Sequence, residues 1–114
     1  IDPAIYDNYL FLVSDENLLI SIDLKTGEIL YSKFIEKEIV GLLKTKEDNI
    51  SIDAIKVLNS DLYFFIKKSF IVIYDKKGQI KKNLILKKKP NSEIIFINRD
   101  MLFLDKNNRL VILN

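Results

Sequence analysis

The chain has 114 residues, of which 48% are hydrophobic and 30% charged, and its formal net charge is +2. This balance is typical of one folded domain and excludes a disordered chain, and no apolar run approaches the roughly 20 residues that cross a bilayer. Because the chain contains no cysteine and no histidine, disulfides, thiolate metal sites and histidine-based catalysis are excluded.

Residues 7–23 are the first of three copies of one pattern. They align without gaps with residues 59–75 at an offset of 52, which align in turn with residues 98–114 at an offset of 39. In each copy an apolar run, a short polar turn and a second apolar run follow one another, which is typical of a β-hairpin. Self-similarity at such a period indicates a repeat architecture.

Each repeat is predicted to contain four short antiparallel strands, except that the last ends before its fourth. The predicted strands are 4–6, 10–13, 18–22 and 29–35 in the first repeat, 54–58, 62–66, 70–74 and 80–86 in the second, and 94–97, 101–104 and 110–113 in the third. Four-stranded blades of roughly 40 to 50 residues are the units of a β-propeller. The sequence therefore predicts an all-β fold of about three propeller blades, the last one incomplete.

We expect one partial propeller domain over residues 1–114, with blade one at 1–35, an insertion at 36–53, blade two at 54–89 and blade three at 90–114. Because a closed propeller usually has roughly four to eight blades, the chain is expected to be a fragment of a larger propeller. An unpaired edge strand at residues 109–113 would then favour self-association, since open edges template pairing.

The insertion at 36–53 interrupts the repeat and carries an apolar patch. The patch consists of Ile39, Val40, Leu42 and Leu43. If these side chains are exposed, they are the candidate contact for a protein partner, because contiguous exposed apolar residues mark interaction sites. If the segment folds back, it extends a strand or covers the end of the core. Both readings remain open from the sequence.

Charge is distributed unevenly along the chain: residues 1–57 carry a net charge of −5 and residues 58–114 a net charge of +7. Most of the basic excess is lysine in turns or alternating with apolar residues, which is typical of solvated blade edges. The alternative is an anion-binding or nucleic-acid-binding face. Since the chain has only two arginines, which suit bidentate phosphate recognition, we predict no nucleic-acid partner.

Two repeats continue into a second polar turn that starts with an aspartate and has a glycine near its end. Asp23 and Gly27 occupy these places in the first copy, and Asp75 and Gly78 in the second. An aspartate carboxylate accepts hydrogen bonds from turn amides, and glycine supplies the positive φ that closes such a turn. We therefore predict a structural role for all four residues.

The stretch 21–31, SIDLKTGEILY, resembles the repeat of the PQQ-like (quinoprotein-type) β-propellers, whose loose signature is A-x-D-x-x-T-G-x-x-x-W. Asp23, Thr26 and Gly27 match the Asp, Thr and Gly of that signature, and Tyr31 stands where the docking tryptophan usually lies. The second copy keeps the aspartate and glycine in a turn that is one residue shorter and has no threonine.

Among PQQ-like propellers, the chain is most similar to the BamB family of outer-membrane β-barrel assembly lipoproteins. That resemblance implies a noncatalytic interaction scaffold without a cofactor. It also implies a periplasmic, outer-membrane-associated parent protein that binds the barrel-forming subunit of the assembly machinery. The alternative is a noncatalytic portion of a pyrroloquinoline-quinone-dependent dehydrogenase, whose family uses adjacent cysteines and docking tryptophans that this chain lacks. No catalytic, cofactor-binding or metal-binding residue is predicted.

Overall fold

The computed structural model describes residues 1–44, 50–67 and 69–113. In chain order the elements are β1 (Ala4–Tyr6), β2 (Tyr9–Val13), β3 (Leu18–Asp23), β4 (Ile29–Phe34), α1 (Glu36–Leu43), β5 (Ile52–Leu58), β6 (Asp61–Ile66), β7 (Phe70–Tyr74), β8 (Ile80–Ile85), β9 (Ile95–Ile97), β10 (Asp100–Leu104) and β11 (Leu110–Leu113). Every strand predicted from the sequence is present, with ends that differ by at most two residues.

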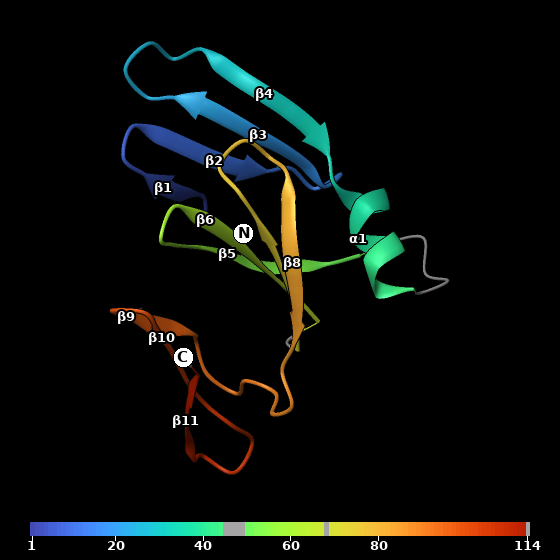
Figure 1. Ribbon diagram of the computed structural model, residues 1–114, viewed down its shortest axis with the longest axis vertical. Helices are drawn as coiled ribbons and strands as arrows, with labels where there is room; N and C mark the ends of the chain where they lie inside the picture. The colour runs from blue at the N-terminus through green and yellow to red at the C-terminus, as the bar shows by residue number, and fades with distance from the viewer. Residues whose placement is uncertain (45–49, 68, 114) are drawn as a thin grey trace.

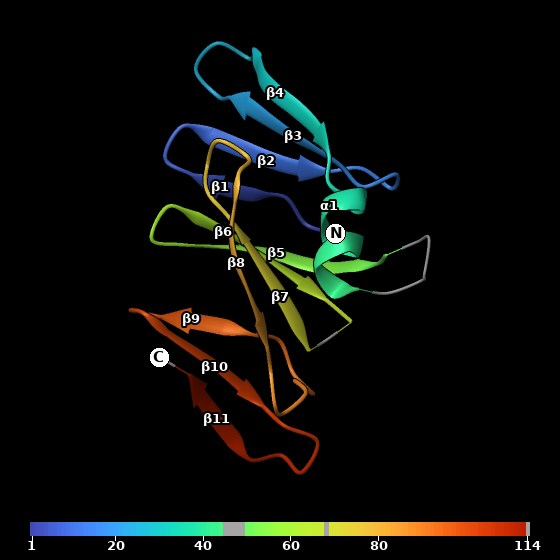
Figure 2. The same cartoon turned by 45° about the vertical axis from the view of Figure 1, so that its right-hand side comes forward.

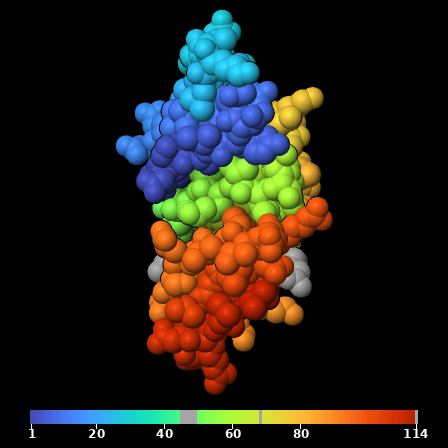
Figure 3. Space-filling view, turned by 90° about the vertical axis from the view of Figure 1, so that its left-hand side faces the viewer, coloured from blue at the N-terminus to red at the C-terminus, as the bar shows by residue number. Residues whose placement is uncertain are grey.

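The strands form three antiparallel sheets in which each strand pairs with its neighbour in sequence: β1 to β4, β5 to β8, and β9 to β11. Figures 1 and 2 show the sheets stacked one on another, with β1 to β4 at one end, β5 to β8 in the middle and β9 to β11 at the other end. In the space-filling view the same order gives successive blue, green and orange-red bands (Figure 3). The predicted all-β fold of antiparallel propeller blades is confirmed, and the third blade has three strands within the described residues.

The repeat extends to the irregularities of the sheets. A register shift lies between Ser21 and Ile22 in blade one, and another lies between Ile73 and Tyr74, 52 residues later, in blade two. A bulge bends its strand and increases the local twist, so both blades twist at the same place before their outermost strands β4 and β8. Sequence offset and backbone geometry therefore define the same repeat.

The same hydrogen-bonded turn occurs in blade one and in blade three. In the β10–β11 turn, Asp105 Oδ1 accepts hydrogen bonds from the amides of Asn107 (2.9 Å) and Arg109 (3.0 Å). In the β2–β3 turn, Ser14 Oγ accepts the equivalent bonds from Glu16 (3.2 Å) and Leu18 (3.1 Å). Short side chains that bond amides two and four residues later favour turns over strands, which explains why the apolar runs before Ser14 and Asp105 stop where they do.

The middle blade is buried on both sides, and two apolar clusters result. The cluster between blades one and two includes Phe11, Leu19, Phe64 and Tyr74, each with 0% or 1% of its surface exposed. The cluster between blades two and three includes Phe65, Ile71 and Ile73 from blade two and Met101 and Phe103 from blade three. Because side chains alternate across a strand, neighbouring residues of β6 and β7 serve opposite clusters.

The outward faces of blades one and three are apolar and solvent-exposed. On blade one, cross-strand pairing places Ile5, Leu10, Ile22 and Ile29 in one row, and Phe34 on the same face is 63% exposed. On blade three the outward face carries Ile95, Ile97, Leu102, Leu104, Leu110 and Ile112. Blade faces of this kind normally pack on a neighbouring blade, as both faces of blade two do here.

Candidate functional site

Residues 36–43 of the insertion form helix α1, which the sequence analysis did not predict. Helix α1 starts with Glu36 and Glu38 in its first turn, where acidic side chains interact favourably with the helix dipole. It ends at Leu43, and the C-cap residue Lys44 adopts a left-handed conformation with φ of 52°. Apolar residues at positions 35, 39, 42 and 43 follow helical spacing, and this signal in the sequence would have revealed the helix.

Helix α1 folds back over the end of the core between β4 and β5 (Figures 1 and 2). Ile39 is 0% exposed and belongs to the core, so this side chain is not available at the surface. Val40, Leu42 and Leu43 are half-buried against the same cluster. The structure thus supports the alternative in which the segment covers the core, while a partner contact through the remaining three residues stays a prediction.

Lys33 of β4 joins the helix to both neighbouring blades. Its Nζ forms an ion pair with Glu38 Oε1 at 2.7 Å and donates a hydrogen bond to the Gly78 carbonyl at 2.7 Å. The same Nζ lies 5.7 Å from the ring centroid of Tyr74. One cation therefore connects blade one, α1 and the β7–β8 turn of blade two.

Tyr74 is completely buried, and its hydroxyl donates a hydrogen bond to Glu38 Oε2 at 3.4 Å. Burial, then the nearby Glu38 carboxylate, raises the pKa of Tyr74 above its ordinary value. The phenol thus stays protonated as a hydrogen-bond donor to the helix. Sequence reasoning missed the Lys33–Glu38 ion pair, because residues 33 and 38 belong to different elements.

Tyr31 of β4 docks on the β7–β8 turn of the next blade. Its hydroxyl donates a hydrogen bond to the Lys76 carbonyl at 3.0 Å. A Cβ added to Gly78 would lie 2.9 Å from Tyr31 Cε1, so the glycine lets the ring approach the turn backbone closely. Burial, followed by the charge of Asp75, raises the pKa of Tyr31 to about 12. Tyr31 therefore makes an interblade contact at the place where the resemblance puts a docking tryptophan.

The predicted turn residues lie where turn chemistry requires them. Asp23 Oδ1 accepts a hydrogen bond from the Lys25 amide at 2.8 Å, and Thr26 Oγ1 accepts one from the Glu28 amide at 3.2 Å. Asp75 Oδ1 accepts bonds from the amides of Lys77 (2.9 Å) and Gln79 (3.0 Å). Gly27 and Gly78 have φ of 75° and 85°. These residues build two turns and do not converge on one site.

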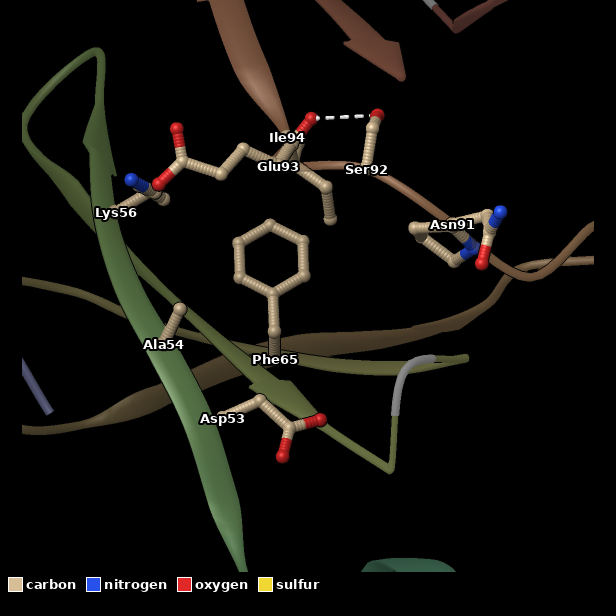
Figure 4. Close-up of a pocket in the computed structure, with 9 residues that line it drawn as sticks. Asp53, Ala54, Lys56, Phe65, Asn91, Ser92, Glu93 and Ile94 are labelled. Carbon is tan, nitrogen blue, oxygen red and sulfur yellow. Dashed lines mark hydrogen bonds between the residues drawn. The ribbon is translucent and has the colours of Figure 1, made fainter. Parts of the chain in front are cut away.

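A recess of about 470 Å³ lies between blades two and three. The Phe65 ring points into it toward Ile94, with Ala54 beside the ring (Figure 4). Lys56 and Glu93 lie on one side and Asn91 on the other (Figure 4). An apolar floor with charged side chains at the rim can hold an apolar side chain of a protein partner.

Within residues 1–44, 50–67 and 69–113, no three His, Cys, Asp or Glu side chains gather as ligands for a metal ion. None of the described helices is long and apolar enough to cross a membrane.

No protein-family model and no curated protein matches the sequence. Among solved structures, the fold is similar to that in the crystal structure of BamB from Moraxella catarrhalis, with a TM-score of 0.66 and 11% sequence identity. The match covers 96% of this chain and 30% of the BamB chain. The chain therefore has the fold of part of a β-propeller and corresponds to about a third of the length of that structure.

Proposed function

We propose that the chain is part of a noncatalytic protein-binding scaffold of the BamB type, associated with the outer membrane on the periplasmic side. Its partner would be the barrel-forming subunit of the outer-membrane assembly machinery. The observation that carries the proposal is the fold shared with BamB over nearly the whole chain. The resemblance of residues 21–31 to the PQQ-like repeat supports it independently.

In this proposal the apolar outward faces of blades one and three are covered by further blades of the same propeller. Both faces of blade two are covered in this way, by blades one and three. The outward faces present the same kind of surface, including Ile29 at 64% and Leu110 at 60% exposure. A further blade is the occupant that continues the stack, and the BamB chain contains more than three times the matched length.

The partner contact in this proposal is the outward side of α1 with its half-buried residues Val40, Leu42 and Leu43. Ile39 contributes indirectly by fixing the helix to the core. Gly41 is exposed, and a Cβ added there would meet no atom within 4 Å. A large side chain at position 41 would thus obstruct a partner without disturbing the packing of the chain.

The test is Gly41→Arg, with binding to the purified barrel-forming subunit measured by biolayer interferometry. The matched control is Gln79→Arg, which adds the same side chain at an exposed turn position of blade two. We expect Gly41→Arg to weaken binding about tenfold or more, as blocking a central interface position does, and Gln79→Arg to leave binding unchanged. If the wild-type chain does not bind the subunit, the proposed function is wrong. If it binds and Gly41→Arg binds equally well, the helix is not the contact.

A further inference from the structure

Five cationic side chains line one recess between the segment after β8 and the β10–β11 turn. The recess has a volume of about 500 Å³ and is lined by Lys87, Lys88, Lys89, Lys106 and Arg109, together with Asp105 and Asn107. The three consecutive lysines follow β8, and the other residues belong to the β10–β11 turn. All five cations are exposed, and no ion pair joins any of them to a carboxylate of the described residues.

The lysine segment is held in place at both ends. Before it, Leu86 is 8% exposed, and its amide donates to the Ser69 carbonyl at 2.7 Å. After it, Pro90 is buried, and the Asn91 amide donates to the Leu104 carbonyl at 2.7 Å. Ser92 Oγ accepts a hydrogen bond from the Leu104 amide at 2.9 Å. Because Leu104 directly precedes the β10–β11 turn, these bonds fix the three lysines beside Lys106 and Arg109.

Asp105, the one acidic residue in the lining, is directed into its own turn. Its side chain is 5% exposed, and its carboxylate accepts two turn amides. The Arg109 amide, then the Asn107 amide and the charges of Lys88 and Arg109, hold the pKa of Asp105 below its ordinary value. The ionised carboxylate thus stabilises the turn and offsets one of the five positive charges around the recess, which leaves a net charge of +4 among the lining residues.

We propose that this recess binds a compact polyvalent anion of the phosphate class, either free or as the headgroup of a lipid. Several like charges around one small volume raise the local concentration of a counter-ion that carries more than one charge. None of the described residues that line the recess is aromatic, so they offer the bases of a nucleic acid no stacking surface. An acidic peptide spreads one charge per side chain along its length, which fits a compact recess less well. This binding is independent of the protein scaffold role.

The probe is inorganic pyrophosphate, titrated into the full chain and followed by amide chemical shifts. Lys88→Gln, Lys106→Gln and Arg109→Gln are combined in one variant, and the control combines Lys37→Gln, Lys76→Gln and Lys82→Gln, which removes the same charge from exposed positions elsewhere. We expect shifts at residues 87–92 and 105–109, about tenfold weaker binding in the recess variant, and little change in the control. Binding should also weaken as salt rises from about 50 to 200 mM.

Equal losses in the two variants, or shifts spread over the whole chain, would overturn the proposal in favour of nonspecific attraction to net charge. Tighter binding of polyglutamate or of an oligonucleotide than of pyrophosphate, through the same residues, would overturn the phosphate class. Co-flotation with vesicles containing phosphatidylglycerol, but not with phosphatidylcholine vesicles, would assign the anion to a lipid headgroup. Pyrophosphate binding without flotation would assign it to a free phosphate compound.

Discussion

The two interfaces that flank the middle blade differ in kind. Between blades one and two, polar contacts supplement the apolar cluster: Ser60 Oγ donates to Tyr6 Oη at 2.8 Å, and Tyr31 and Lys33 bond the β7–β8 turn. Between blades two and three, the contacts among described side chains are apolar, with Tyr63 and Phe96 packed edge to face at 5.4 Å. Directional bonds specify one arrangement, whereas an apolar interface with a recess of about 470 Å³ tolerates adjustment.

The two outer blades are attached to the middle blade in different ways. Blade one is attached to blade two by hydrogen bonds to turn carbonyls, so its orientation depends on the turn geometry of its neighbour. Blade three packs on blade two through apolar side chains, and its hydrogen bonds described above join Leu104 to Asn91 and Ser92 of the connecting segment. We therefore expect substitutions at the first interface to be more destabilising and more sensitive to atomic detail than those at the second.

We expect the largest loss of stability when one of two neighbouring residues of β6 is truncated. Phe64 faces blade one, is 0% exposed and lies 5.0 Å from the Tyr74 ring, whereas Phe65 faces the recess toward blade three. Phe64→Ala should lower the free energy of unfolding by about 3–5 kcal/mol, because it leaves a closed cavity. Phe65→Ala should cost about 2–3 kcal/mol, since water can enter the enlarged recess.

Chemical denaturation of both variants measures the difference. If Phe64→Ala does not fold, Phe64→Leu against Phe65→Leu provides the same comparison at smaller cost. Equal losses of unfolding free energy at the two positions would show that the recess does not reduce the cost of truncating a side chain at the interface between blades two and three.

The second prediction concerns the two turn glycines. Gly78→Ala should cost about 2–3 kcal/mol, because it combines a positive φ with a contact to the Tyr31 ring. Gly27→Ala is the matched control: its φ of 75° is similar, but a Cβ would meet nothing within 4 Å, so only the backbone strain of about 1 kcal/mol remains. Thermal unfolding of both variants measures the gap, and identical losses would mean that Tyr31 does not dock tightly on the turn.

The third prediction follows from the raised pKa of Tyr31, about 12 in the folded chain against an ordinary value near 10. The folded state keeps this proton at a pH where the unfolded state releases it. The stability due to the raised pKa is therefore fully present below about pH 10 and is lost as the pH rises through about 12. At neutral pH, Tyr31→Phe should lower the free energy of unfolding by about 1 kcal/mol, because the hydrogen bond is lost. Between about pH 10 and 12, the stability of the variant should fall less steeply with pH than that of the wild type.

Alkaline unfolding of wild type and Tyr31→Phe, followed by circular dichroism, tests this sign. The phenol absorbance should show one fewer late-titrating tyrosine in the variant. A variant whose stability falls as steeply with pH as that of the wild type would contradict the prediction.

Much of the fold could be predicted from the sequence because local sequence patterns define each repeat. Alternating apolar runs define the strands, and turn aspartates and glycines such as Asp75 and Gly78 define their ends. The spacing of apolar residues in the insertion signals helix α1, but the burial of Ile39 depends on tertiary structure, because this side chain enters the core only when the helix packs against it. The basic recess also depends on tertiary structure, since Lys88 and Lys106 become neighbours only when the segment after β8 is fixed to β10.

We expect the smallest difference in stability between variants of two ion pairs of similar length. Lys33 and Glu38 lie 2.7 Å apart with side chains that are 30% and 31% exposed, and Lys81 and Asp61 lie 2.8 Å apart with side chains that are 49% and 19% exposed. Exposed ion pairs contribute little to stability, so Lys81→Gln should leave the free energy of unfolding almost unchanged. Lys33→Gln should cost about 1 kcal/mol, because its Nζ also bonds the Gly78 carbonyl and lies over Tyr74.

Double-mutant cycles with Glu38→Gln and Asp61→Asn measure the coupling energy of each ion pair. A coupling at Lys33–Glu38 no larger than that at Lys81–Asp61 would show that polar contacts do not distinguish the first interface, and that apolar packing fixes both.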